Sequence, residues 1–260
     1  MSIREKLKQR EEKRDQAANG GNNGNLPEGV TRYVRLGQEL KDGKTFVLLA
    51  DPDKWYFYYT HEDGDFATRS TYVRKHTCLH SPREVGEDFT KFEKPDKAAC
   101  ISCAAKAKRK LYFMVPVFDP GYNEWRVLDL KEFHASKIIA DYDGIVAAVS
   151  DATGQADYEH VGKGVSIAKT SDGRSYTMKS AKVDTKVIEA AKAVDVTSID
   201  YAELANFREV DDITKILSEA TDEAKLDKSV LGVAATSAPA NEPFADDGKP
   251  IDISADDLPF

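Results

Sequence analysis

The chain has 260 residues, of which 41% are hydrophobic and 32% charged, and its formal net charge is -8 at pH 7. No apolar run is long enough for a transmembrane helix, and three cysteines, an odd number, exclude a fully paired disulfide framework. Residues 1–130 carry 23 Lys/Arg against 20 Asp/Glu, residues 131–231 carry 13 against 19, and residues 232–260 carry 1 against 6. A basic front and an acidic tail are typical of a polyanion-binding face with a tethered competitor for it.

Residues 1–25 are predicted to be a basic arm followed by a linker. Helix-forming residues dominate positions 2–18, which hold the basic side chains Arg4, Lys6, Lys8, Arg10, Lys13 and Arg14. This stretch is either a solvated helix or an arm that reaches to DNA or to a neighbouring subunit. Positions 19–25 contain only Gly and Asn, so we expect a flexible linker there.

From residue 26 onward the pattern indicates short strands with helices between them. Strands are predicted at 30–36, 44–50, 54–60, 71–75, 111–118 and 124–130, and a hairpin at 161–178. Helical periodicity covers 131–149, 184–194 and 207–219, and a short helix is expected near 103–110. Several short strands separated by Gly, Pro and Asp favour a small sandwich or barrel with helical additions.

All three cysteines lie between residues 54 and 118, and they indicate a metal site. Cys100 and Cys103 are separated by two residues, so one turn can chelate a metal, and Cys78 supplies a third thiol. Three histidines lie upstream of or beside Cys78: His61, His76 and His80. The pattern predicts one structural Zn²⁺ held by the cysteines and one histidine. The alternatives are a redox-active thiol pair, which would make the protein an oxidoreductase, or three inert thiols.

Basic and aromatic residues around the cysteines predict a nucleic-acid-binding face. Proteins that hold single strands without sequence preference place basic side chains along the backbone and aromatic rings under the bases. Side chains alternate along 111–118, and the face with residues 111, 113, 115 and 117 is the better candidate for the core. Tyr112 points to the other face and is therefore the best candidate for stacking on a base. Residues 54–59 carry aromatics on both faces, so we expect one face to be exposed. The predicted DNA contacts are Trp55, Tyr58, Arg74, Lys106, Lys108, Arg109, Lys110, Tyr112 and Arg126.

Residues 232–260 are acidic and low in complexity, and we expect them to be disordered. Such a tail can occupy a basic groove when DNA is absent, and its apolar tip can dock in a partner's basic-rimmed pocket. The partner-binding residues are predicted to be Asp256, Asp257, Leu258, Pro259 and Phe260. The chain therefore divides into an arm and linker at 1–25, a core at 26–231 with a zinc subdomain at about 61–110, and a tail at 232–260.

The order of basic arm, strands, histidine, cysteines, basic stretch, aromatic strand and acidic tail resembles the zinc-containing single-stranded DNA-binding replication proteins of T-even-type bacteriophages. The similar segments are residues 46–52, 59–61, 70–78, 100–103 and 108–120, within a region that runs from about 44 to 178. The stretch between Cys78 and Cys100 is longer here than in that family. The last residues resemble the acidic tip, ending in Pro-Phe, of bacterial single-stranded DNA-binding proteins.

This resemblance implies a mainly β fold, an oligonucleotide-binding (OB) barrel with an inserted zinc subdomain, and His61 as the fourth zinc ligand. It implies a non-enzymatic protein of the host cell cytoplasm that coats exposed DNA strands and melts secondary structure during phage replication, recombination and repair. The expected partners are single-stranded DNA, replication and recombination proteins at the tail, and further copies of the chain at the N-terminal arm. The competing interpretations are an RNA-binding or transcription-associated zinc module and a thiol oxidoreductase.

Overall fold

The computed structural model describes residues 26–68 and 73–232. Several predictions fall outside the described residues. They concern the basic arm, the start of the strand predicted at 71–75, the tail from residue 233, and the tail's partner-binding residues Asp256, Asp257, Leu258, Pro259 and Phe260. Within the described ranges, no helix is both long enough and apolar enough to span a bilayer.

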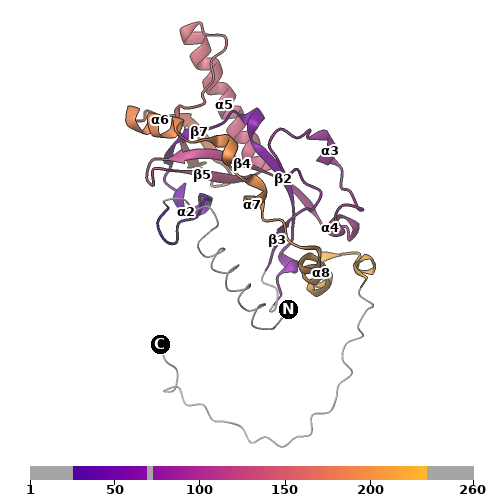
Figure 1. Cartoon of the computed structure of the whole chain (residues 1–260). Coiled ribbons are helices and arrows are strands. Elements are labelled where there is room, and N and C mark those ends of the chain that lie inside the picture. The colour runs from indigo at the N-terminus through magenta and orange to yellow at the C-terminus, as the bar shows by residue number, and fades with distance from the viewer. Residues whose placement is uncertain (1–25, 69–72, 233–260) are drawn as a thin grey trace, which may run out of the picture.

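An antiparallel sheet forms the centre of the described chain, and helices surround it (Figure 1). The strands are β1 (Lys44–Leu48), β2 (Tyr56–Glu62), β3 (Lys75–Thr77), β4 (Arg109–Asp119), β5 (Glu124–Lys131), β6 (Gly164–Lys169) and β7 (Tyr176–Ser180). They follow the order β3-β2-β4-β1-β6-β7, with β5 paired to β4 outside that path. This arrangement confirms the prediction of a mainly β fold with helical additions.

Strand β4 organises the sheet because it pairs with three other strands. Its first half pairs with β2, its end pairs with β1, and β5 runs beside it from Tyr112 to Asp119. Pro116, which has no N–H to donate, lies where the neighbour of β4 changes from β2 to β1. Its carbonyl accepts from the Leu49 N–H, so the position without an N–H faces the residue that follows β1, just beyond the paired residues Leu48 and Val117.

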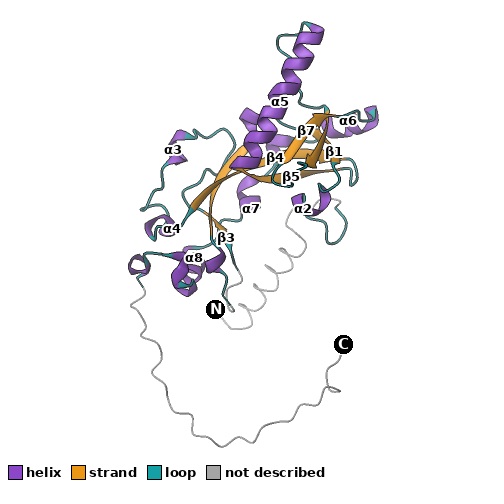
Figure 2. Ribbon diagram, turned by 180° about the vertical axis from the view of Figure 1, so that it is seen from behind, coloured by secondary structure: helices purple, strands orange, loops and turns teal. Residues whose placement is uncertain are grey.

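The main core lies between the sheet and α5 (Glu132–Thr153), and includes Phe46, Leu48, Val115, Ile138 and Ile167. Figure 2 shows the far end of α5 projecting beyond the sheet. This helix ends where Gly154 adopts a left-handed conformation at φ 71°. At the opposite end of the molecule, α8 (Val210–Glu219) packs its apolar face against Phe66, Ala105 and Ala107, below the cysteine-bearing turn.

The remaining helices are short: α2 (Leu36–Glu39), α3 (Thr90–Glu93), α4 (Ile101–Ala104), α6 (Thr185–Lys192) and α7 (Tyr201–Ala205). Three predicted elements differ from the structure. The strand predicted at 71–75 is β3, which begins only at Lys75 and runs to Thr77 within the described residues. The strand predicted at 30–36 is only a bridge at Tyr33, because nearby carbonyls accept hydrogen bonds from the Arg126 side chain instead of from a strand. The helix predicted at 103–110 is α4, which lies earlier and contains the cysteine turn itself.

Candidate metal centre and adjoining groove

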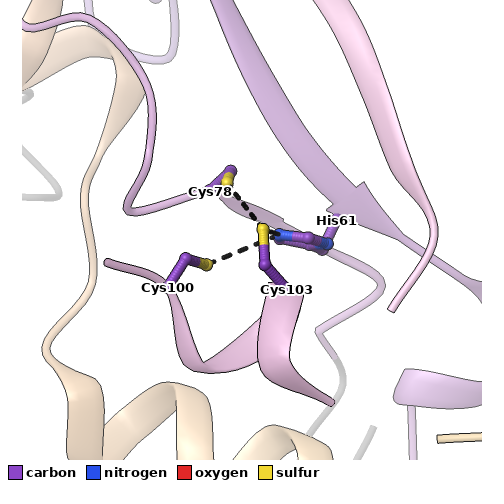
Figure 3. A group of neighbouring side chains, drawn as sticks. All are labelled: His61, Cys78, Cys100 and Cys103. Atoms are coloured by element: carbon purple, nitrogen blue, oxygen red, sulfur yellow. Dashed lines mark hydrogen bonds between the residues drawn. The ribbon is translucent and has the colours of Figure 1, made fainter. Parts of the chain in front are cut away.

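Four donor side chains converge near the end of β2 (Figure 3). His61 belongs to β2, Cys78 directly follows β3, and Cys100 and Cys103 belong to the turn that forms α4. All four are buried, and their donor atoms lie within 4.8 Å of one another. The Sγ atoms of Cys78 and Cys103 are 3.6 Å apart, and Nε2 of His61 is 3.6 Å from the Sγ atoms of both Cys100 and Cys103.

Backbone hydrogen bonds place these donors. The Cys78 N–H donates to the Tyr59 carbonyl at 2.8 Å, which fixes Cys78 beside β2. Nδ1 of His61 lies 3.1 Å from the Ala107 carbonyl, which follows the cysteine turn. A carbonyl can only accept, so Nδ1 carries a proton, and in the neutral imidazole that binds a metal the lone pair of Nε2 would point at the sulfurs. The histidine is therefore oriented as a ligand by the same segment that carries Cys103.

The other two candidate histidines lie outside this cluster. Nε2 of His76 is 2.8 Å from Oγ of Ser102, inside the cysteine turn, and burial lowers the pKa of His76 to about 3, helped by the neighbouring His61. His76 therefore stays neutral and supports the turn. Nε2 of His80 is 3.2 Å from the Lys91 carbonyl, so that imidazole points at α3.

The electrostatics of the cluster are compatible with a bound cation. Hydrogen bonds from the Cys103 and Cys78 thiols lower the pKa of Cys100, whereas the pKa of Cys103 is raised because a second thiolate would lie against the first. Burial acts to lower the pKa of His61, but its contacts with Cys100 and Cys78 outweigh burial and raise it to about 9. A divalent cation removes the repulsion that otherwise opposes a second thiolate.

The cluster can hold one metal ion. A tetrahedral Zn²⁺ with Zn–S bonds of 2.3 Å places two sulfurs about 3.8 Å apart, close to the 3.6 Å between Cys78 and Cys103. Three sulfurs and one imidazole are also donors that Zn²⁺ accepts. The site is thus compatible with zinc, and its four protein donors leave no position for a reacting water.

Several predicted DNA contacts are buried in this conformation, which corrects the expectation of an exposed aromatic face. Trp55, Tyr58 and Tyr112 lie in the core, and both faces of β2 are covered. Tyr56 and Tyr58 pack in a cluster with Ile199 and Tyr201, which belong to a segment far along the chain, and the other face of β2 packs on the cysteine region.

Arg126 is also buried, at 1% exposure, and so is not placed to contact DNA. Its guanidinium donates to the Glu39 carboxylate at 2.6 and 2.8 Å, to Asp119 at 2.9 Å and to the Thr31 and Tyr33 carbonyls. The burial of a charge at this depth requires such partners. Arg126 is therefore part of the fold.

The remaining predicted basic contacts differ in their surroundings. Arg74, Lys106, Lys108 and Lys110 are exposed, and the three lysines pair with Asp227, Asp63 and Glu62 respectively. Arg109 instead donates to the carbonyls of Phe92, Glu93 and His80, while its Cζ lies 3.4 Å from the centre of the Tyr59 ring. Arg109 thus attaches the loop before Cys100 to β4.

A groove that the sequence analysis missed lies between this loop and the start of α5. Its volume is about 460 Å³, and its lining residues are Tyr59, Phe89, Glu93, Arg109, Lys110, Leu111, Lys131, Glu132 and Phe133. Phe133 is 65% exposed and Phe89 is 39% exposed, which is unusual for such large apolar rings. A lone phenylalanine in a polar stretch was the available signal for both.

A larger cavity, of about 820 Å³, lies beyond the end of β1. Four carboxylates line it, from Asp51, Glu84, Glu159 and Asp200, against the two cations of Lys54 and Arg83. This balance disfavours a polyanion there.

The chain matches no protein-family model, no curated protein and no solved structure.

Proposed function

We propose that this chain is a zinc-containing single-stranded DNA-binding protein and that the groove beside the metal centre receives the strand. The observation that carries this proposal is one groove whose lining includes the exposed rings of Phe89 and Phe133 together with Lys110 and Lys131, whose ammonium groups pair with Glu62. Sequence-independent single-strand binding needs these two kinds of group side by side, rings for the bases and cations for the phosphates.

The metal is proposed to be one structural Zn²⁺ held by His61, Cys78, Cys100 and Cys103. Its ligands come from β2, from the end of β3 and from α4, so a bound ion would tie these elements together. Phe89 lies in the segment between Cys78 and Cys100. The ion would thereby hold one wall of the groove relative to the sheet, and its binding energy would add to the folding energy.

The proposal assigns stacking to Phe133 and Phe89 rather than to the buried Tyr112. Each stacked base contributes about 1 to 3 kcal/mol, and every base has a face on which to stack. A protein with these contacts melts hairpins without ATP, because it binds only the unpaired form and shifts the equilibrium toward it. The antiparallel sheet around β4 and the resemblance to the phage family support an OB barrel and a non-enzymatic role in phage replication, recombination and repair.

Burial of the cysteines disfavours the oxidoreductase alternative. A catalytic dithiol has to reach the disulfide of its substrate, whereas Cys78, Cys100 and Cys103 are at most 4% exposed. The RNA-binding alternative has the same chemistry in the groove and is separated by experiment.

The test is an anisotropy titration of the full chain with labelled oligothymidylate, oligouridylate and a DNA duplex, at several salt concentrations. We expect oligothymidylate to bind most tightly and its affinity to fall as salt rises. Phe133→Ala should weaken binding by about tenfold or more with an unchanged salt slope. The control is Val210→Ala, at an exposed apolar residue of α8. Equal affinity for duplex and single strand would refute the proposal, and a preference for oligouridylate would favour the RNA module.

A further inference from the structure

Glu62, the last residue of β2, touches both lysines of the proposed groove. Its carboxylate lies 3.1 Å from Nζ of Lys131 and 3.4 Å from Nζ of Lys110, and it accepts a hydrogen bond of 2.8 Å from the Tyr112 hydroxyl. The strand register produces this meeting, because β4 pairs with β2 at Lys110 and with β5 at Tyr112, opposite Lys131. One carboxylate therefore serves cations from two neighbouring strands.

The two ion pairs are suited to exchange. Lys110 and Lys131 are 43% and 45% exposed and Glu62 is 25% exposed, so solvent reaches all three groups. Exposed pairs of this kind are weak. A phosphodiester offers two anionic oxygens, as a carboxylate does, and can take over both ammonium groups.

We infer that Glu62 is an internal counter-ion, which holds Lys110 and Lys131 while the groove is empty and which a backbone phosphate of the bound strand displaces. This inference rests on the proposed function and adds a means of setting its affinity. A displaced carboxylate stays beside the incoming phosphate, because the sheet fixes Glu62 and its Tyr112 hydrogen bond remains. The repulsion between them weakens binding and speeds release of the strand.

Other carboxylates near the groove lack this double contact. Glu93 and Glu132 line the groove. Asp63, just after β2, pairs with Lys108, and Asp129 of β5 pairs with Lys75 of β3. These groups reduce the net positive charge of the surface. Glu62 alone joins both lysines of the groove within the described ion pairs, so its charge has the largest effect on phosphate binding.

The test is Glu62→Gln in the full chain, titrated with oligothymidylate over a series of salt concentrations. The glutamine amide keeps an oxygen that can accept from Tyr112, removes the charge and replaces the second oxygen with an NH2 group. We expect affinity to rise about three- to tenfold at low salt, and the slope of log K against log salt to steepen by up to about 0.7, the value for one further phosphate neutralised on a single strand. Glu189→Gln, at an exposed ion-paired carboxylate of α6, is the matched control and should bind as the wild type does.

An unchanged or weaker affinity of a folded Glu62→Gln protein would overturn the inference. If that variant unfolds, Glu62→Ser removes the same charge with a smaller side chain and has to show the same gain. Binding by the wild type with no gain in either variant refutes only the role of Glu62. Absence of oligothymidylate binding by the wild type and the variants refutes the proposed function, and the inference with it.

Discussion

Replacing Cys100 with serine examines the metal centre through the stability of the fold. Cys100 is buried, and its Sγ is 3.6 Å from Nε2 of His61. The substitution leaves three of the four donors, and a serine hydroxyl is a poor ligand for Zn²⁺. The bound metal content should therefore fall well below the one ion per chain that we propose for the wild type.

The size of the effect follows from the chain that the metal closes. A bound ion would join Cys78 and Cys100 around a loop of roughly twenty residues, and a cross-link of that length contributes about 3 kcal/mol by restricting the unfolded chain. We expect the free energy of unfolding to fall by about this amount. For a chain of this size the melting temperature should fall by roughly 6 to 12 °C.

Hydrogen exchange followed by mass spectrometry locates the loss. Amides between residues 79 and 99 should exchange faster in Cys100→Ser and in chelator-treated wild type, because both lack the ion. The hairpin of β6 and β7, remote from the cysteines in the sheet order, serves as the internal control. Metal-free wild type with unchanged melting and unchanged protection of residues 79–99 would refute a structural role for the metal.

Three further predictions concern the fold. Arg126→Met should lower stability by about 3 to 5 kcal/mol in denaturant titrations, because the buried Asp119 and the partly buried Glu39 lose their guanidinium partner and keep only Lys44 as a cationic partner. The folded variant should keep its DNA affinity. Normal stability with weak DNA binding would show that Arg126 contacts DNA instead. Burial acts to raise the pKa of Glu39, but hydrogen bonds from Arg126 and Lys44 lower it to about 2. The contribution of the Glu39 carboxylate to the free energy of unfolding is therefore complete above pH 4.5 and is lost toward pH 2. Solvent screening limits this loss to roughly 1 to 2 kcal/mol in acid titrations, and Arg126→Met should make the loss smaller. Gly164→Ala would place a Cβ 2.4 Å from a backbone oxygen and should lower stability by about 1 to 3 kcal/mol. The control is Gly144→Ala, in open space on α5, which should be neutral or stabilising. Equal melting temperatures for the two variants would contradict the packing at Gly164.

The metal cluster could be anticipated in part because its signal is local. Two cysteines separated by two residues imply chelation from one turn in any fold, and Cys78 is the remaining thiol. The choice among the histidines is not local. It depends on the contact of His61 with the carbonyl that follows α4, and on the hydrogen bond that turns His76 toward the same helix. The spacing of these residues along the chain predicts neither of these two contacts.

The proposed DNA-binding face was harder to predict because burial depends on distant segments. Alternation correctly identified the two faces of β4, but on the second face Tyr112 packs beside the tyrosine side chains of the neighbouring β2 and is covered by residues of the C-terminal part of the core. The burial of Arg126 was equally hard to predict, because its partner Glu39 lies far from it in sequence. Phe133 is left exposed by its position at the start of α5, beside the groove.

Photo-crosslinking tests most directly the claim that the groove holds a single strand. The full chain would be irradiated with an iodouracil-substituted single strand, and the modified peptides would be identified by mass spectrometry. We predict adducts on the peptides that contain Phe133 and Phe89, and their loss when unlabelled single strand, but not duplex, is added in excess. Adducts confined to peptides outside the groove, or equal competition by duplex, would contradict the proposed function.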